Sequence, residues 1–523
     1  MPDTATHSAV RGITDHLYHH AATQPQRPFV LYGDSIHTYS DIASLVAACA
    51  NRLARAGVAA GDRVALVCGN RPAFLVAWFA LNEIGAIAVP LNTGLRADSL
   101  RYTLKQSESR LLLIEPELLE EKKADIASIP SLEVWEIDAS MEAPAGHHPR
   151  YERITAPSPH DPACILYTSG TTGLPKGVVL SNAAYVAAGV DMAESLGLAA
   201  DERIMVFLPL FHANPQMYAV TSALQMGASI ALIPKFSASR FFEDAARYQA
   251  TGFTYVGTVL AILEKHHPQP NLAHSIKWCV GGGAPKRVWG EIEQRFGIAV
   301  RELYGMTETG AWVSMNVAGA TRFGSVGAAR KNITLSIRDE HGAPLPTGDK
   351  GEIVSRASRP DIFFTEYWRN PEATAQTLKN GWLHTGDRGW LDEDGYLYFD
   401  GRVKELIRRG GEMIAPTEIE QQLLKHPLVK DCTVIGVPDE IMGEEIRAVI
   451  VAEGKADPIT LRDHLADKLA PHMIPRYFSF VDAIPKTETE KVKRHEVAEM
   501  PMTTVDLHAS RRAANPSEKE NRQ

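Results

Sequence analysis

The sequence predicts an α/β fold with a large N-terminal domain of mostly parallel sheets flanked by helices, followed by a small α+β C-terminal domain. The chain has 523 residues, of which 45% are hydrophobic, so it can bury a large core and favours two or more domains. Helical patterns alternate with short apolar runs before residue 160 and again after it, which is typical of βαβ units. Past Gly381 the pattern changes to turns and hairpins.

Short apolar runs and amphipathic stretches place the N-terminal elements. The most apolar stretch, residues 73–91, contains Asn82, Glu83 and Pro90, and therefore predicts a buried helix followed by a strand rather than a membrane span. A helix is expected at 239–248. Strands are expected at 63–68, 86–91, 163–166, 229–234, 252–256 and 276–280.

The C-terminal region predicts a compact mixed unit. Residues 381–402 are rich in Gly, Asp and Tyr and predict hairpins, after which we expect a helix at 416–426 and strands at 431–437 and 445–451. The expected domains are 1–402 and 403–500. Residues 501–523 are polar without hydrophobic period, and we expect a disordered tail there.

Composition excludes several classes of function. A net charge of -9 and a pI near 6.1 leave no broad basic surface for nucleic acid. The five cysteines, which lack paired spacing, indicate a reduced protein without a zinc site, and the first thirty residues carry no apolar signal core, so we expect a cytoplasmic protein without an integral membrane segment. They are Cys49, Cys68, Cys164, Cys279 and Cys432.

A loop of hydroxyl and glycine residues that ends in lysine predicts a phosphate site. Glycines let backbone N–H groups approach phosphate oxygens, hydroxyls add donors, and lysine adds a positive charge. Because Pro175 precedes Lys176, the loop is not a Walker motif. After the expected strand at 163–166 it reads Tyr167, Thr168, Ser169, Gly170, Thr171, Thr172, Gly173, Leu174, Pro175, Lys176, Gly177.

This loop resembles the phosphate loop of the adenylate-forming superfamily of acyl-CoA synthetases, peptide-synthetase adenylation domains and luciferases. The resemblance covers nearly the whole chain, and its nearest branch looks like the crotonobetaine/carnitine-CoA ligases and their bacterial relatives. Further landmarks follow in the family's order: Gly283-Ala284-Pro285, Tyr304-Gly305-Met306-Thr307-Glu308-Thr309, Thr385-Gly386-Asp387, Gly401-Arg402 and Pro485-Lys486-Thr487 leading to Lys491.

The resemblance assigns the nucleotide-binding residues. Glu308 matches the residue that holds magnesium, and Thr307 matches the hydroxyl that contacts the α-phosphate. Tyr304 is the expected aromatic face for adenine, opposite Gly283-Ala284-Pro285 and followed by Gly305 and Met306. Asp387 is expected to accept both ribose hydroxyls, and Arg402 to share that role or reach the phosphates. Taken alone, each could be an ordinary core or loop residue.

Lys491 matches the family's catalytic lysine, with one departure from the pattern. The family has glycine immediately before it, whereas this chain has Glu490. A non-glycine residue at positive φ would cost about 1 kcal/mol, and the carboxylate would partly neutralise the lysine. Lys493 is the rival candidate in the same loop.

The resemblance also implies a mobile C-terminal domain that serves two half-reactions. It places the hinge at Lys404 and the pantetheine tunnel at Gly410 and Gly411, although a glycine turn between two strands is the alternative. His212 matches the aromatic residue that closes the acyl pocket, and a buried packing histidine is its alternative. Gly281 to Gly283 remove side chains near that pocket, which favours a bulky or polar acid over a thin fatty chain.

The predicted function is an ATP-dependent carboxylic acid–CoA ligase that forms an acyl-adenylate with release of pyrophosphate and then transfers the acyl group to CoA. Its predicted partners are ATP, Mg²⁺, CoA and a small carboxylic acid, and a homo-oligomer stays open. The alternatives are a free-standing adenylation enzyme that loads a separate carrier protein and a non-catalytic binding protein of this fold. The retained Lys176, Glu308 and Asp387 oppose the last.

Overall fold

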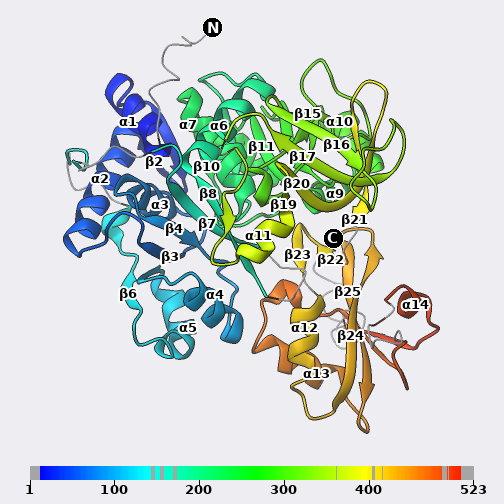
Figure 1. Cartoon of the computed structure of the whole chain (residues 1–523). Coiled ribbons are helices and arrows are strands. Elements are labelled where there is room, and N and C mark those ends of the chain that lie inside the picture. Colours follow the sequence, from blue (N-terminus) through cyan, green and yellow to red (C-terminus); the bar gives the residue numbers. More distant parts are fainter. Residues whose placement is uncertain are drawn as a thin grey trace. The chain divides into compact units, whose positions relative to one another are not determined.

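The computed structural model describes residues 12–142, 148–152, 158–168, 174–360, 362–402, 407–414, 416–485, 492 and 494–507 (Figure 1). The described residues form two compact units. The larger comprises the described residues of 12–93, 102–168 and 176–402, and the smaller comprises those of 94–101, 174–175 and 407–507. None of the helices in the described ranges combines the length and apolar character that a membrane crossing requires.

The first sheet of the larger unit has seven strands and carries the phosphate-loop region. Five of its strands run parallel, and two further strands at one edge each pair antiparallel with their neighbour. The outermost strand at this edge comes from much later in the chain than the others. The strands in spatial order are β18 (Glu366–Tyr367), β8 (Lys176–Ser181), β7 (Pro162–Thr168), β4 (Ile87–Pro90), β3 (Arg63–Val67), β5 (Leu111–Ile114) and β6 (Glu133–Glu136).

The second sheet has nine strands, of which the central six run parallel and the outer three are antiparallel to their neighbours. Its spatial order is β15 (Ala328–Ala329), β14 (Ser314–Met315), β13 (Ala299–Tyr304), β12 (Trp278–Gly282), β11 (Gly252–Val256), β9 (Arg203–Val206), β10 (Ser229–Leu232), β1 (Pro28–Tyr32) and β2 (Ser35–Thr38). These two sheets confirm the predicted α/β fold.

The helices of the larger unit pack on both sheets. Helix α3 (Pro72–Glu83) is buried along its whole length, as a helix that is apolar all round must be, and one core cluster joins it to strands of both sheets. The other helices are α1 (Ile13–Thr23), α2 (Tyr39–Arg55), α5 (Pro116–Ala127), α6 (Asn182–Leu196), α7 (Thr221–Met226), α8 (Phe241–Tyr248), α9 (Gly257–His266), α10 (Lys286–Phe296) and α11 (Pro371–Thr377). Helix α4 (Ala97–Gln106) contributes residues 97–101 to the smaller unit and 102–106 to the larger.

A third, antiparallel sheet of five strands completes the larger unit. Its strands β20 and β21 form the hairpin expected over residues 381–402. The strands are β16 (Ile333–Arg338), β17 (Gly351–Ala357), β20 (Trp382–Leu391), β19 (Leu378–Lys379) and β21 (Leu397–Arg402).

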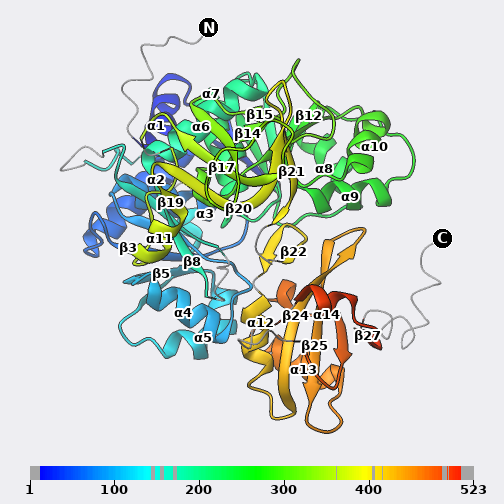
Figure 2. The same ribbon diagram turned by 45° about the vertical axis from the view of Figure 1, so that its right-hand side comes forward.

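The smaller unit is an α+β sandwich around one mixed sheet (Figure 2). Apolar residues alternate along β24: Val434 packs with α12 and α13 on one face, and Ile435 packs with α14 on the other. The strands are β22 (Ile407–Arg409), β23 (Glu412–Ile414), β24 (Val429–Asp439), β25 (Gly443–Ala452), β26 (Tyr477–Phe480) and β27 (Thr504–Asp506). The helices are α12 (Pro416–Leu423), α13 (Pro458–Ala466) and α14 (Arg494–Glu499).

The expectation of a disordered tail from residue 501 is wrong for residues 501–507. Strand β27 pairs antiparallel with β26, Arg476 forms a bidentate ion pair with Asp506, and Leu507 is buried. The sequence did not predict this strand because it has no alternating pattern of apolar residues. Pairing with β26, which is distant in the chain, stabilises it instead. Residues 508–523 lie outside the described residues.

Candidate active site

The phosphate loop spans the hairpin of β7 and β8. The register of this hairpin places Thr168 directly opposite Lys176, so both residues stand at the base of the loop. The predicted residues Ser169, Gly170, Thr171, Thr172 and Gly173 lie outside the described residues. The hairpin is anchored below the loop, where the Tyr167 hydroxyl donates a hydrogen bond to Gln106.

Glu308 lies in a short helical turn, Thr307–Thr309, that follows β13. The turn is closed by Thr309, whose hydroxyl accepts from the Met306 N–H at 3.0 Å and donates to the Met306 carbonyl at 2.7 Å. Gly310 ends it at φ +58°, and a Cβ there would lie 1.8 Å from the Ile362 carbonyl oxygen. These contacts fix the backbone of the turn, in which Glu308 is 4% exposed.

Tyr367 brings Lys176 and Glu308 to one place. Its hydroxyl donates to Glu308 Oε1 at 2.7 Å, and Lys176 Nζ lies 4.9 Å from the centre of its ring. Tyr367 was not predicted from the sequence, because it stands in a turn-rich segment without periodic pattern. The structure therefore unites the predicted phosphate lysine and the predicted magnesium carboxylate through a residue that was not predicted.

Tyr304 and Asp387 are also brought together. The Tyr304 hydroxyl donates to Asp387 Oδ2 at 2.7 Å, and both residues are buried. The Tyr304 ring lies 5.7 Å from that of Phe399 at an interplanar angle of 30°. Strand register sets Arg402 opposite Asp387. The predicted ribose residue and the predicted adenine residue thus form one connected group.

Gly283, Ala284 and Pro285 follow β12 and are held by a buried carboxylate. Glu302 Oε1 accepts from the N–H groups of Gly283 at 2.5 Å and Ala284 at 3.1 Å, while Oε2 accepts from the Tyr255 hydroxyl at 2.5 Å. Burial, and next the charge of Glu302, raise the pKa of Tyr255, which keeps this phenol a donor. Glu302 was also not predicted, because it stands beside Arg301 in a strand of mixed character, β13.

The interpretation of the glycine run as room for a bulky acid is wrong for Gly281 and Gly282. A Cβ on Gly281 would lie 2.1 Å from the Tyr255 carbonyl oxygen, and one on Gly282 would lie 2.9 Å from that of Leu303. Both glycines pair within the sheet ladder, so close strand packing requires them. The same ladder carries β12 two residues beyond the expected strand end.

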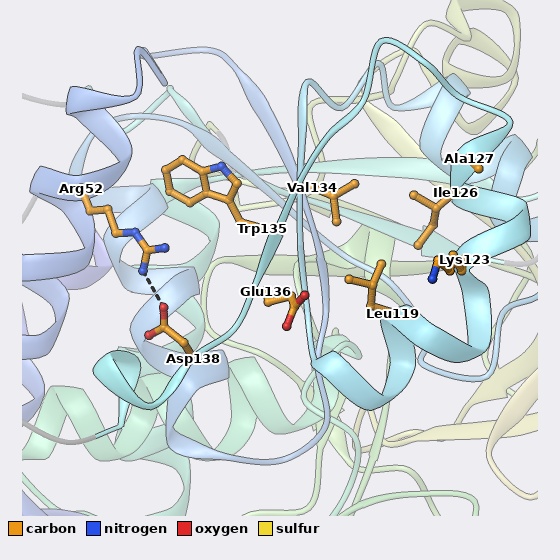
Figure 3. A pocket seen from close by; sticks show the side chains of 9 residues that line it. All are labelled: Arg52, Leu119, Lys123, Ile126, Ala127, Val134, Trp135, Glu136 and Asp138. Carbon is orange, nitrogen blue, oxygen red and sulfur yellow. Dashed lines mark hydrogen bonds and ion pairs between the residues drawn. The ribbon is translucent and has the colours of Figure 1, made fainter.

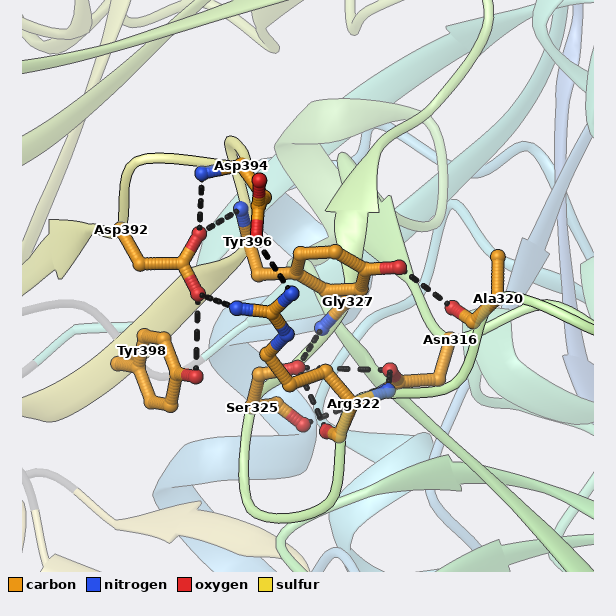
Figure 4. A network of polar contacts seen from close by, with 9 residues as sticks. All are labelled: Asn316, Ala320, Arg322, Ser325, Gly327, Asp392, Asp394, Tyr396 and Tyr398. Carbon is orange, nitrogen blue, oxygen red and sulfur yellow. Dashed lines mark hydrogen bonds and ion pairs between the residues drawn. The ribbon is translucent and has the colours of Figure 1, made fainter.

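The hairpin that carries Asp387 is braced at its turn by Arg322 (Figure 4). The guanidinium donates to Asp392 at 2.8 Å and to Asp394 at 2.6 Å, and it stacks on Tyr396 at 4.4 Å. Arg322 comes from the segment after β14. The brace fixes the turn between β20 and β21 to the nine-stranded sheet.

His212 lies half-buried beside Phe211, with ring centres 4.5 Å apart. The backbone N–H of His212 donates to the Pro209 carbonyl at 3.0 Å, and a π-helix, Pro215–Val220, begins three residues later. Such segments are often found at functional sites. Asn214 ties this stretch to β11 by donating to the Tyr255 carbonyl at 3.1 Å. The segment that follows His212 is therefore bonded to the strand that carries Tyr255.

In the smaller unit, Gly410 and Gly411 form the two-residue turn between β22 and β23, at φ +61° and +87°. Two successive positive φ values are typical of a tight hairpin turn. The alternative interpretation of this pair, a glycine turn between two strands, is therefore correct, and a functional role would be additional to it. Arg409, just before the turn, is fixed by a bidentate ion pair with buried Glu445. Lys404, Lys491 and Lys493 lie outside the described residues.

A separate surface groove of about 670 Å³ holds none of the predicted residues (Figure 3). At one end Arg52 donates to Asp138 at 2.9 Å and stacks on Trp135 at 5.0 Å. Its lining residues are Arg52, Leu119, Lys123, Ile126, Ala127, Val134, Trp135, Glu136 and Asp138. We assign it no role in the site.

Comparisons with known proteins give two family models and several relatives. A family model described as AMP-binding enzyme matches residues 17–368, and one described as AMP-binding enzyme C-terminal domain matches residues 418–491. The chain is 34% identical over 490 residues to a sulfoacetate–CoA ligase of Cupriavidus necator, covering 91% of this chain and 95% of that protein. It is 35% identical to a feruloyl-CoA synthase of Amycolatopsis sp, covering 91% and 96%.

The predicted branch is among the relatives as well: a crotonobetaine/carnitine–CoA ligase of Salmonella agona is 33% identical over 79% of this chain and 83% of its own. An o-succinylbenzoate CoA synthetase from Bacillus subtilis, solved with a product analogue, superposes with a TM-score of 0.84 at 28% identity, covering 94% and 99%. A malonyl-CoA ligase with methylmalonyl-CoA and AMP bound superposes with a TM-score of 0.76 at 31% identity, covering 88% and 97%.

One family model thus spans more than half of the residues, and relatives above 30% identity match most of the chain. The chain belongs to the AMP-binding enzyme family.

Proposed function

We propose that this chain is an ATP-dependent acid–CoA ligase. A carboxylate oxygen of the acid attacks the α-phosphorus of ATP, the bond to the β-phosphate breaks, and pyrophosphate leaves. The thiol sulfur of CoA then attacks the acyl carbon, the thiol proton is lost, and AMP leaves. The observation that carries the proposal is the convergence of Lys176 and Glu308 on Tyr367.

The first step needs charge compensation more than covalent chemistry, because a weak nucleophile must approach a polyanion. Lys176 supplies a positive charge at the base of the phosphate loop, and Thr307 supplies a hydroxyl beside Glu308. Asp387, fixed by Tyr304, is the acceptor for the ribose hydroxyls. Tyr304 and the Gly283-Ala284-Pro285 segment are the proposed walls for adenine.

Glu308 fits a magnesium ion that arrives with ATP. Magnesium prefers oxygen ligands and usually binds one or two carboxylates together with substrate phosphates. Glu308 offers one buried, oriented carboxylate, and within the described part of the chain no cluster of three His, Cys, Asp or Glu forms a cage. When bound, the ion would neutralise charge that develops on the phosphate oxygens.

The smaller unit is proposed to serve both steps in turn. By resemblance, Lys491 supplies charge to the adenylation step, and the Gly410-Gly411 turn lines the path of the CoA arm. Lys404 is the proposed hinge between these two states. His212 is proposed to close the acyl site until CoA arrives.

Pyrophosphate release tests the proposal across a panel of acids, each with and without CoA. The relatives suggest sulfoacetate, ferulate, indoleacetate and crotonobetaine as the first members. Release that rises with one acid and yields its thioester is the expected result. Pyrophosphate release that depends on the acid but is unchanged by CoA would instead favour an enzyme that loads a carrier protein. No release with any acid would contradict both the ligase and the carrier-loading enzyme.

A further inference from the structure

The position of Tyr367 suggests more than a packing role. Its side chain is 4% exposed, yet it contacts two charged groups of opposite sign: its hydroxyl bonds to Glu308 Oε1 and its ring face lies under Lys176 Nζ. The three residues come from distant parts of the chain. A buried tyrosine that only filled space would need one hydrogen-bond acceptor and no ammonium group above its ring.

The backbone around Tyr367 is bonded to both of the elements it connects. Strand β18 pairs with β8, with Tyr367 opposite Val178, and the Trp368 N–H donates to the Gly177 carbonyl at 2.7 Å. On the other side, the Phe364 N–H donates to the Glu308 carbonyl at 2.9 Å. A five-residue segment therefore links the strand that starts at Lys176 to the turn that carries Glu308.

Gly177 allows β8 to pack closely on β7, beside the same segment. A Cβ at this position would lie 2.7 Å from Ile165 and 3.4 Å from the Trp368 side chain. The Tyr367 N–H donates to Thr374 Oγ1 at 2.9 Å, so the other end of the segment is fixed as well. The tyrosine ring is thus held from both sides and has little freedom to follow a moving partner.

The two contacts act on different charges. A phenol that donates to a carboxylate forms a charge-assisted hydrogen bond, which sets the direction of the carboxylate. The face of an aromatic ring is electron-rich and attracts an ammonium group above it. The hydroxyl therefore orients Glu308, while the ring places Lys176.

We propose that Tyr367 is a positioning residue for the adenylation step, which holds the Lys176 ammonium and the Glu308 carboxylate at a fixed separation for the triphosphate of MgATP. The proposal rests on the function proposed above. It assigns the hydroxyl to the magnesium side and the ring to the phosphate side. These two roles can be separated by substitution.

The test measures ATP binding by calorimetry without acid, at magnesium concentrations from zero to saturation. Tyr367→Phe keeps the ring and removes the hydroxyl, so we expect ATP alone to bind as in wild type and MgATP to bind about tenfold more weakly at low magnesium. Saturating magnesium should restore the affinity of the Tyr367→Phe variant for MgATP. Tyr367→Leu removes both contacts and should weaken ATP binding at every magnesium concentration.

Tyr39→Phe is the matched control, because Tyr39 is also buried and its hydroxyl donates to backbone carbonyls, those of Ala228 at 2.7 Å and Ala223 at 3.4 Å, rather than to a carboxylate. It should lower the melting temperature without altering the magnesium dependence. A double-mutant cycle with Glu308→Gln should show that the Tyr367→Phe effect disappears once the carboxylate is gone.

An unchanged magnesium dependence in Tyr367→Phe, or additive effects in the cycle, would overturn the positioning role. Wild-type protein that binds MgATP but releases no pyrophosphate with any acid would instead contradict the proposed ligase, while the binding data still decide the role of Tyr367.

Discussion

At the scale of single residues, Glu302 fixes the segment that is proposed to face adenine. Glu302→Ala leaves the N–H groups of Gly283 and Ala284 without their acceptor, at a cost of about 1 to 3 kcal/mol for each buried group. We expect the KM for ATP to rise about tenfold with little change in kcat. Steady-state pyrophosphate release measures both constants.

Glu302→Gln is the control, since its amide oxygen can still accept from both N–H groups. It should recover most of the ATP affinity. A fall in kcat at unchanged KM in both variants would show that Glu302 does not act through the nucleotide segment.

His20 makes stability depend on pH. Burial, followed by the charge of His19, lowers the pKa of His20 from 6.5 to about 4, and the ring bonds to the Leu224 carbonyl at 2.9 Å. The unfolded chain therefore binds a proton that the folded chain excludes, so this contribution is complete above pH 6.5 and is lost as pH falls toward 4.

His20→Gln retains a donor for Leu224 but does not titrate. Its melting temperature should fall less steeply than that of wild type between pH 6.5 and 4. Parallel slopes in the two proteins would contradict this account.

The site residues differ in how well the sequence could predict their roles. Tyr304, Glu308, Asp387 and Lys176 stand in contiguous motifs, and the structure gathers them in two groups. Tyr367, Glu302 and Phe399 carry no motif, because each acquires its role from a partner far away in the chain. Long-range contacts of this kind leave no local pattern.

Among the elements, the Gly410-Gly411 turn has both a structural role in the hairpin and a proposed role in the path of CoA, and a substitution can distinguish the two. Gly411→Leu forces a side chain into positive φ and, if the turn lines the CoA path, blocks thioester formation while adenylation continues. Misplacing a reactant slows its step by about 10²-fold, so we expect thioester formation to fall by about that factor. Supplied acyl-adenylate with CoA measures the second step alone.

Gly454→Leu is the matched control in the same unit, with φ +88° and no heavy atom within 4 Å of its Cβ. It carries the same backbone strain without a proposed role, so it should lower stability and leave thioester formation intact. An equal loss of thioester formation in both variants would show that the effect of Gly411→Leu comes from destabilising the smaller unit and not from blocking CoA.

Most elements were predictable where the pattern was strong. Strand β11 spans the expected residues, and α3 followed by β4 appears where the apolar stretch was interrupted. Strand β12 runs further than predicted because glycines give no apolar signal, although neighbouring strands hold them in the ladder. Strand β27 was missed because its partner, not its composition, makes it a strand.

At the scale of the whole molecule, β27 closes the smaller unit. A chain cut after residue 500 loses the pairing with β26, the Arg476–Asp506 ion pair and buried Leu507. We expect its smaller unit to melt earlier and to be cleaved by protease before the larger unit. A chain cut after residue 507 is the control and should behave as wild type; equal stability of the two truncated chains would contradict a role for β27.

The two proposed half-reactions should separate when Lys491 is changed. Lys491→Ala should abolish acyl-adenylate formation and leave CoA transfer from supplied acyl-adenylate largely intact, because the lysine charge is needed only while pyrophosphate departs. Lys493→Ala is the control and tests the rival lysine. Loss of both half-reactions in Lys491→Ala would contradict the two-state proposal.

Strand β18 joins its sheet from late in the chain, and Trp368 bonds across 262 positions to Gln106. Closure over such a distance comes late in folding, since the entropy of the intervening loop must be overcome first. A nascent chain that has emerged only to residue 360 would already contain the phosphate loop, Tyr304 and Glu308, yet lack Tyr367 and Asp387. Nucleotide binding should therefore begin only after both β18 and the part of β20 that carries Asp387 have left the ribosome.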